Sequence, residues 1–353
     1  MSFDLSALLR PHIRNLKPYT SARDEYSGTE GVFLDANENP YGSITDEDFN
    51  RYPDPYQQGL KDRIAKIRDL DSSRIFLGNG SDEAIDLLFR AFCNPGVDNV
   101  ILLPPTYGMY GVSASINATE TISVPLTEDF QLQSEKILEA FNEKSKILFI
   151  CSPNNPSGNS LNHDEIEKLI KEFPGIVVID EAYVDFMSEE SFVKKLDEFQ
   201  NLVVLQTFSK AWGLASLRLG MAFASEEVIR VLNKIKPPYN ISGLTQTTVL
   251  DALGNIDQMK KMVANILEQR NHLRSELESI DGVIKVFPSD ANFLLVKIAN
   301  ASKAYQDLIE RKVILRNRSN VMLCEDCLRV TIGTAQENEI FLSELKNWLS
   351  KNS

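Results

Sequence analysis

One lysine, Lys210, stands directly after an apolar run, a position in which its amine could take part in a reaction. The apolar run "VVLQTF" leads directly into Ser209 and Lys210. A run this apolar is typical of a buried strand, and lysine is rarely buried because removing its ammonium group from water is costly. An amine held at the end of a strand can attack a carbonyl group or act as a general base. Lys210 is therefore the first candidate for a catalytic residue.

Other reactive side chains also stand directly after apolar runs. Asp180 ends "IVVID", Tyr183 follows it in "EAY", and Asn155 lies in the turn "SPNNPSG" after "ILFIC". Tyr107 follows "VILLPPT", where it either packs at the rim of a site or stacks on a flat ligand. Asp180 needs a partner, because a lone buried carboxylate is costly. That partner is either a basic side chain in a structural salt bridge or a cationic group of a ligand.

The elements that carry these residues indicate a doubly wound α/β fold. Five short runs rich in Val, Ile and Leu alternate with amphipathic, helix-like segments between residues 74 and 210. The runs do not alternate apolar with polar residues, which is typical of strands covered on both faces in a mainly parallel sheet. Because ligands bind beyond the carboxyl ends of the strands in such sheets, we expect these residues to meet at one edge.

The C-terminal part of the chain predicts a second, smaller domain. A helical pattern over 256–280 is followed by four strand-like pieces between 284 and 333 and by a terminal helical pattern. We expect an N-terminal arm at 1–40 that packs with the small domain, a large domain at 41–255 and a small α+β domain at 256–353.

The residues at the strand ends together match one ligand, pyridoxal 5′-phosphate (PLP). This cofactor carries a phosphate, a basic ring nitrogen, a phenolic oxygen and an aldehyde. The loop "GNGSD" enters a helix and offers free N–H groups to an anion. We expect the phosphate to be bound by Ser81, Asp82, Ser209 and Arg218, and the ring oxygen by Asn155 and Tyr183. Asp180 would pair with the ring nitrogen, and Lys210 would form a Schiff base with the aldehyde. Tyr107 would lie beside the ring.

The composition of the chain excludes several classes of binding partner. The net charge of −13 argues against binding to nucleic acid or to an anionic membrane. No apolar run approaches the ~20 residues that span a bilayer, and the start lacks a signal-peptide pattern, so a cytoplasmic location is expected. Cys324 and Cys327 form a CxxC, but there is no second pair and only three scattered histidines. We therefore expect two thiols and no metal site.

Several motifs resemble those of the fold-type I aminotransferases, and the resemblance covers nearly the whole chain. These motifs are "SPNNPSG", "DEAYVDF" and "TFSKAWGLASLRLG". A second set is more similar to the histidinol-phosphate aminotransferase family: "PYTSARDE", "LDANENPYG", "YPDPY", "GNGSDEAI" and "CLRVTIGT". The resemblance implies catalytic roles for Lys210, Asp180 and Tyr183 and activity as a homodimer. It also implies that Tyr52, in "YPDPY", reaches the cofactor phosphate of the other subunit. The residues alone indicate only a proline turn before a helix there.

The resemblance further implies a reaction in histidine biosynthesis, in which L-histidinol phosphate and 2-oxoglutarate give imidazole-acetol phosphate and L-glutamate. Arg329 in "CLRVTIGT", Arg316 in "VILRNRSN", Tyr19 in "PYTSAR" and Asn155 would bind the substrates. Arg318 lies two residues beyond Arg316, and a surface salt bridge is the alternative for Arg316. Aromatic amino acid aminotransferases and a threonine-phosphate decarboxylase have similar motifs and are the alternatives. A PLP-binding regulator would need an added DNA-binding domain, for which the chain has no spare length.

Overall fold

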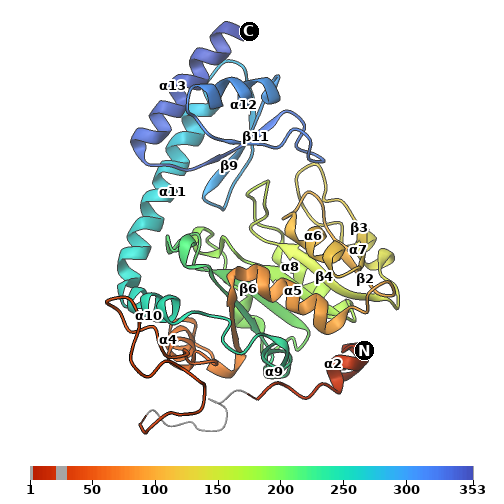
Figure 1. Ribbon diagram of the computed structural model, residues 1–353. Coiled ribbons are helices and arrows are strands. Elements are labelled where there is room, and N and C mark those ends of the chain that lie inside the picture. Colours follow the sequence, from red (N-terminus) through yellow and green to blue (C-terminus); the bar gives the residue numbers. More distant parts are fainter. Residues whose placement is uncertain (1–2, 21–29, 353) are drawn as a thin grey trace.

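The five apolar runs all form strands of one sheet in a computed structural model that describes residues 3–20 and 30–352 (Figure 1). Their residues are almost all buried, because helices cover both faces of the sheet. These strands are β1 (Ile75–Asn79), β2 (Asn99–Leu102), β4 (Ser145–Cys151), β5 (Ile176–Asp180) and β6 (Leu202–Thr207). The sheet also contains β3 (Glu120–Ser123) and β7 (Leu219–Ala224).

The seven strands follow the order β1-β7-β6-β5-β4-β2-β3. Strands β2 to β6 are parallel, while β7 runs antiparallel to both β1 and β6. The predicted α/β class with a mainly parallel sheet is therefore confirmed. Strand β7 escaped the sequence analysis because it follows β6 after a loop with no crossover helix, and β3 escaped because most of its residues are exposed.

The two faces of the sheet each have their own core. On β6, Leu202 and Val204 contact one core and Val203 and Leu205 the other, as the two-residue period of a strand requires. Helices α4 (Gln58–Arg68), α7 (Ser134–Ala140) and α8 (His163–Glu172) cover the first face. The second face is covered by α5 (Gly80–Phe92), α6 (Met109–Ile116) and α9 (Glu226–Ile235).

A smaller antiparallel sheet forms the other end of the molecule. Helix α10 (Gly243–Ala252) leads into the long helix α11 (Ile256–Glu278), which runs from one sheet to the other in Figure 1. The small sheet has the order β10-β11-β9-β8. Its strands are β8 (Val283–Val286), β9 (Phe293–Ile298), β10 (Arg316–Asn317) and β11 (Cys327–Thr331). Helices α12 (Ala301–Glu310) and α13 (Ala335–Asn352) complete its core. The domain limits drawn at residues 40 and 255 stay a prediction.

The first described residues pack on the large sheet's helices and not on the small sheet. Helices α1 (Leu5–Leu8) and α2 (Pro11–Arg14) lie beside α9 in Figure 1. The backbone N–H of Arg10 donates to Ala91 O at 3.0 Å, and Lys234 Nζ donates to Ile13 O at 2.9 Å. Leu5 joins the core formed by α5 and α9. The arm at 1–40 was expected against the small domain, but the apolar residues of α1 and α2 pack on the core formed by α5 and α9.

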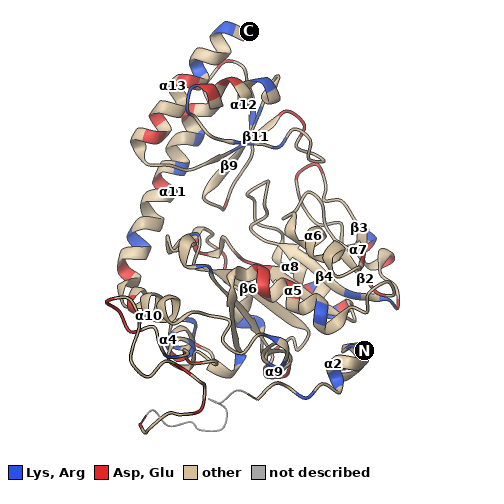
Figure 2. Cartoon of the chain, viewed as in Figure 1, with Lys and Arg blue, Asp and Glu red and all other residues tan. Residues whose placement is uncertain are grey.

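Charged residues are mixed over the surface. Figure 2 shows acidic and basic residues interspersed along the outer helices α11 and α13. Within the described ranges, no helix is both long enough and apolar enough to cross a membrane.

Candidate active site

A cleft of about 870 Å³ lies between the carboxyl ends of the parallel strands and the small sheet. Its lining comes from both sheets, so neither part of the chain forms it alone. Eleven of the thirteen residues predicted for the site line this cleft: Ser81, Asp82, Tyr107, Asn155, Asp180, Tyr183, Ser209, Lys210, Arg218, Arg316 and Arg329. Tyr19 and Tyr52 do not line it.

The start of α5 forms an open cradle for an anion. Gly80 has a φ of +69°, and Gly220 on β7 passes so close that a Cβ atom there would lie 2.1 Å from the backbone nitrogen of Ser81. Without side chains at these positions, the first N–H groups of α5 are left accessible, and a helix N-terminus favours negative charge. Arg218 Nη2 lies 3.9 Å from Asp82 Oδ2 at the same place. These features fit a phosphate group.

Asp180 is a buried carboxylate at the end of β5. Its Oδ2 accepts a hydrogen bond from the Tyr110 hydroxyl at 2.6 Å, and its Oδ1 accepts one from the Ala182 N–H at 3.1 Å. Burial raises the pKa of Asp180 to about 6, although both hydrogen bonds favour the ionised form. No described basic side chain forms an ion pair with it, so the structural salt bridge considered from the sequence is absent among the described residues. A carboxylate in this state is suited to a cationic ligand group.

Lys210 lies three residues beyond β6 and faces the cleft, so it is not buried within the strand. Its Nζ is 5.6 Å from the centre of the Tyr183 ring. Partial burial lowers the pKa of Lys210, and the positive charges of Arg329 and Arg218 lower it further, while Asp180 opposes them. The lowered pKa favours the neutral amine, the form that attacks carbonyl groups and accepts protons.

Tyr183 and Asn155 connect the large sheet to the small one. The Tyr183 ring packs edge-on against Phe293 of β9, with ring centres 5.2 Å apart. Arg329 Nη1 donates to Asn155 Oδ1 at 2.5 Å, and the Arg329 guanidinium lies 5.2 Å from the centre of the Phe293 ring. These contacts hold Arg329 over the same cleft as Lys210.

Tyr107 lies at the rim of the cleft. Its hydroxyl donates to Asp82 Oδ1 at 3.2 Å, and its ring meets Tyr110 edge-on. Burial and the nearby carboxylate of Asp82 raise the pKa of Tyr107. The phenol therefore stays protonated and acts as a hydrogen-bond donor.

Sequence reasoning missed Tyr110, the residue that holds Asp180. Tyr110 is fully buried and stacks on Phe149, so it does not line the cleft. The available signal was its place three positions after Tyr107, in the stretch that follows the same strand end. Tyr19 is 75% exposed, and Tyr52, 51% exposed, stacks on Tyr239 with ring centres 4.5 Å apart. Within one chain neither reaches the cleft.

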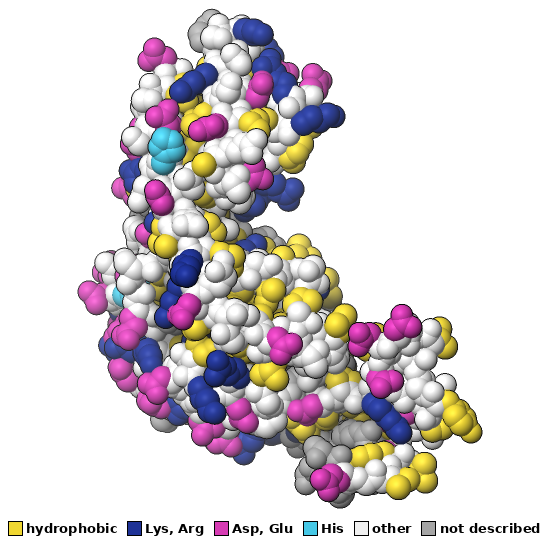
Figure 3. Space-filling model, turned by 90° about the vertical axis from the view of Figure 1, so that its left-hand side faces the viewer, with side chains coloured by type: hydrophobic (Ala, Val, Ile, Leu, Met, Phe, Trp, Pro, Cys, Tyr) yellow, Lys and Arg dark blue, Asp and Glu magenta, His cyan; other side chains and the backbone are white. Residues whose placement is uncertain are grey.

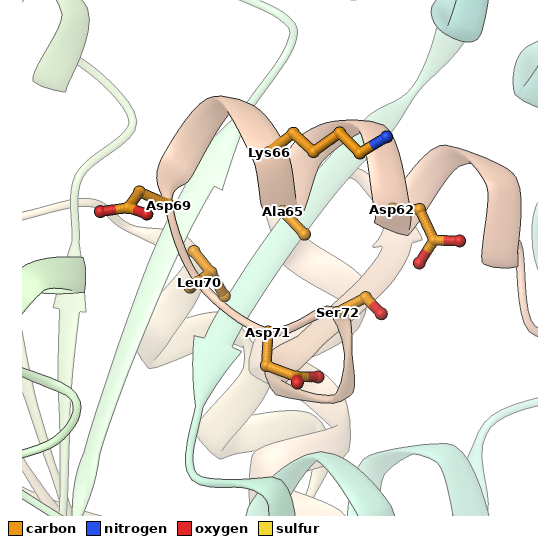
Figure 4. A pocket seen from close by; sticks show the side chains of 7 residues that line it. All are labelled: Asp62, Ala65, Lys66, Asp69, Leu70, Asp71 and Ser72. Atoms are coloured by element: carbon orange, nitrogen blue, oxygen red, sulfur yellow. The ribbon is translucent and has the colours of Figure 1, made fainter.

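A second, more open hollow of about 590 Å³ lies at the end of α4 (Figure 4). Its carboxylates already have local roles. Asp69 pairs with Lys194 at 3.1 Å, Asp62 accepts from Gln58 at 2.7 Å, and Asp71 caps the next turn. The lining residues are Asp62, Ala65, Lys66, Asp69, Leu70, Asp71 and Ser72. Its amine, Lys66, has no arginine beside it in the lining, so this hollow is not a candidate for the same chemistry.

The cysteines are buried, free thiols. Burial raises the pKa of Cys324 to about 12 and that of Cys327 to about 11, which disfavours the thiolate that binds metal. Among the described residues, no three His, Cys, Asp or Glu side chains are grouped closely enough to hold a metal ion.

Comparisons with known proteins agree on one family. The family model described as aminotransferase class I and II matches residues 29–345. The chain is 54% identical to the histidinol-phosphate aminotransferase of Cytophaga hutchinsonii over 348 residues, 99% of this chain and 100% of that protein. It is 53% identical to the histidinol-phosphate aminotransferase of Flavobacterium johnsoniae over 98% of this chain and 99% of that protein.

Solved structures show the same fold at lower sequence identity. The histidinol-phosphate aminotransferase of Clostridium acetobutylicum aligns with a TM-score of 0.80 and 24% identity, over 86% of this chain and 92% of that chain. The histidinol-phosphate aminotransferase of Sinorhizobium meliloti, in complex with pyridoxal 5′-phosphate, aligns with a TM-score of 0.79 and 20% identity, over 97% of this chain and 98% of that chain.

Proposed function

Because the chain belongs to the aminotransferase class I and II family, we propose that it transfers an amino group between L-histidinol phosphate and 2-oxoglutarate. The products are imidazole-acetol phosphate and L-glutamate, and the reaction is a step of histidine biosynthesis, carried out in the cytoplasm. The enzyme depends on pyridoxal 5′-phosphate. Identity of 54% over 99% of the chain to a histidinol-phosphate aminotransferase supports this choice of substrate.

The observation that carries the proposal is a reactive amine and unneutralised arginines in one cleft. Arg316, Arg318 and Arg329 line the same cleft as Lys210. None of the three forms an ion pair with any carboxylate of the described ranges. Histidinol phosphate presents a phosphate and glutamate presents two carboxylates, so the guanidinium groups of Arg316 and Arg329 would serve each anion in turn.

The residues of the cleft fit PLP. The cradle at the start of α5, with Ser81, Asp82, Ser209 and Arg218, would hold its phosphate, and Asn155 and Tyr183 would hydrogen-bond its ring oxygen. When bound, the cofactor supplies an aldehyde for the substrate amine and a ring that accepts electrons. Asp180 would balance the positive ring nitrogen, which gives its buried carboxylate the partner it lacks.

Lys210 is the general base of the proposed reaction. Its Nζ accepts the proton from the substrate Cα and returns it on the same side of the cleft. The lowered pKa of Lys210 favours the neutral amine, which is the form that accepts a proton. Tyr107, with its raised pKa, remains a hydrogen-bond donor and does not compete for the proton.

A second copy of the chain would complete the site. Tyr52 is exposed and does not line its own cleft, which suits a side chain that reaches the phosphate of a neighbouring subunit. Figure 3, which faces α10 and α11, shows hydrophobic side chains gathered on the lower part of the molecule. The segment before α4 and helix α10, which packs on α4, expose apolar residues that include Tyr41, Ile44, Phe49, Tyr52, Tyr56, Leu244 and Leu250. An apolar surface of this kind is typical of a subunit interface, so we propose a homodimer.

The absorbance spectrum of the PLP-loaded protein tests the function. The amine substrate is added without a keto acid. Histidinol phosphate should lower the visible band of the bound cofactor as pyridoxamine phosphate forms, and 2-oxoglutarate should restore it. Lys210→Ala should abolish this exchange, while the matched control Lys194→Ala, which removes a surface pair with Asp69, should keep it. The substrate assignment fails if phenylalanine reacts far faster. Release of carbon dioxide from threonine phosphate, with no keto acid present, would indicate a decarboxylase instead.

A further inference from the structure

The pairing of β10 with β11 gathers three arginines on one face of the small sheet. Arg316 lies directly opposite Arg329 in the antiparallel register. Arg318 is two residues beyond Arg316, and side chains two apart on a strand point to the same face. The backbone N–H of Arg318 donates to Cys327 O at 2.9 Å, which continues the pairing past β10. All three side chains line the cleft.

The backbone of Arg318 is held firmly, but its guanidinium has no structural task. Its carbonyl oxygen accepts from the Val321 N–H at 2.8 Å, which closes a turn beside the cleft. The Nε atom is buried with no hydrogen-bond partner, and no described carboxylate pairs with the side chain. A buried donor without a partner is destabilising unless a ligand binds it.

The mutual repulsion of the three arginines also calls for an anion. Burial lowers the pKa of Arg318, and the charges of Arg329 and Arg316 lower it further. Like charges directly opposite each other on paired strands are destabilising. A group with two negative charges relieves this repulsion better than a group with one. Phosphate esters carry about −1.5 to −2 at pH 7, whereas a carboxylate carries −1.

We propose that Arg318 is a specificity-determining residue that binds the phosphate group of the amine substrate and contributes much less to binding of the carboxylate substrate. Arg316 and Arg329 are shared by both substrates, and Arg318 adds the guanidinium that favours a dianion. The inference rests on the proposed function, since it assumes that the amine substrate is a phosphate ester. The planar guanidinium can bind two phosphate oxygens at once, which a lysine cannot do.

The test compares a phosphate ester with the same molecule lacking phosphate. The value of kcat/KM is measured for histidinol phosphate, histidinol and glutamate in the wild-type protein and in Arg318→Gln. Loss of a charge-assisted hydrogen bond should lower kcat/KM for histidinol phosphate about 10- to 100-fold. The values for histidinol and glutamate should change by no more than about threefold, so the preference for the phosphate ester falls. Arg318→Lys, which keeps the charge, should recover part of that preference.

The matched control is Arg311→Gln. Arg311 belongs to the same part of the chain but pairs with Glu344 at 2.9 Å and does not line the cleft. It should leave all three kcat/KM values unchanged. If Arg318→Gln lowers kcat/KM equally for histidinol phosphate and histidinol, the role given to Arg318 is wrong, while the proposed function still stands. A wild-type protein that does not react with histidinol phosphate would overturn the proposed function and this inference with it.

Discussion

Replacing Asp180 by asparagine should stabilise the cofactor-free protein while destroying its activity. Asp180 is fully buried, and its pKa is raised from 3.8 to about 6. Each pKa unit corresponds to about 1.4 kcal/mol, so keeping this carboxylate ionised at pH 7.5 costs about 3 kcal/mol of folding free energy. The variant keeps both hydrogen bonds, because the asparagine oxygen can accept from Ala182 and the Tyr110 hydroxyl can rotate to accept from the amide. We expect Asp180→Asn to gain about 1–3 kcal/mol at pH 7.5.

The gain should depend on pH with a definite sign. Because the pKa of Asp180 is higher in the folded state, its favourable contribution is complete below pH 3.8 and is lost as the pH rises through about 6. The stability difference between the variant and the wild type should therefore grow by about 2 kcal/mol between pH 4.5 and 7.5. Urea unfolding of both cofactor-free proteins at the two pH values measures it. With PLP bound, the wild type should be more stable than the variant, because the variant cannot balance the charged ring nitrogen.

The same substitution at Asp98 provides the control. Asp98 is also buried, but its carboxylate accepts from the Asn94 N–H at 2.6 Å and lies 3.8 Å from Lys146 Nζ. Asp98→Asn removes the charge that Lys146 faces, so it should destabilise the protein by about 1–3 kcal/mol. The reasoning about Asp180 is refuted if Asp180→Asn is no more stable than the wild type at pH 7.5. It is also refuted if the difference does not change with pH.

Three further perturbations test the site. Tyr110→Phe removes the 2.6 Å hydrogen bond to Asp180, so the pKa of Asp180 should rise above about 6 and urea unfolding should show a loss of about 1–3 kcal/mol. Gly220→Ala places a Cβ atom 2.1 Å from Ser81 N and should weaken PLP binding in a titration. In the control Gly59→Ala, the added Cβ atom on α4 meets nothing within 4 Å, so the free energy of unfolding should rise by about 0.5–1 kcal/mol. If Tyr52 acts across subunits, mixing inactive Tyr52→Ala and Lys210→Ala chains should restore about a quarter of wild-type activity, because half of the dimers carry one intact site.

The strands that support the site could be predicted because burial on both faces leaves a local signal. Continuous runs of Val, Ile and Leu identified β1, β2, β4, β5 and β6, and the residues after each run lie at one edge. Strand β7 has an equally apolar sequence, but its direction depends on a hairpin loop and not on its residues. The position of the N-terminal arm could not be predicted either, because the apolar residues of α1 and α2 could have packed on either part of the molecule.

The sequence by itself determined which chemical groups the protein carries at its strand ends: the amine of Lys210, the carboxylate of Asp180 and the anion cradle before α5. Their types and their places after buried runs are local facts that do not depend on distant contacts. Only the tertiary structure decided that Tyr110 holds Asp180, that Arg329 reaches Asn155 and that Arg318 stands unpaired beside them. Those contacts join residues 70 to 174 positions apart. Their formation depends on how two sheets pack, and no local pattern encodes that.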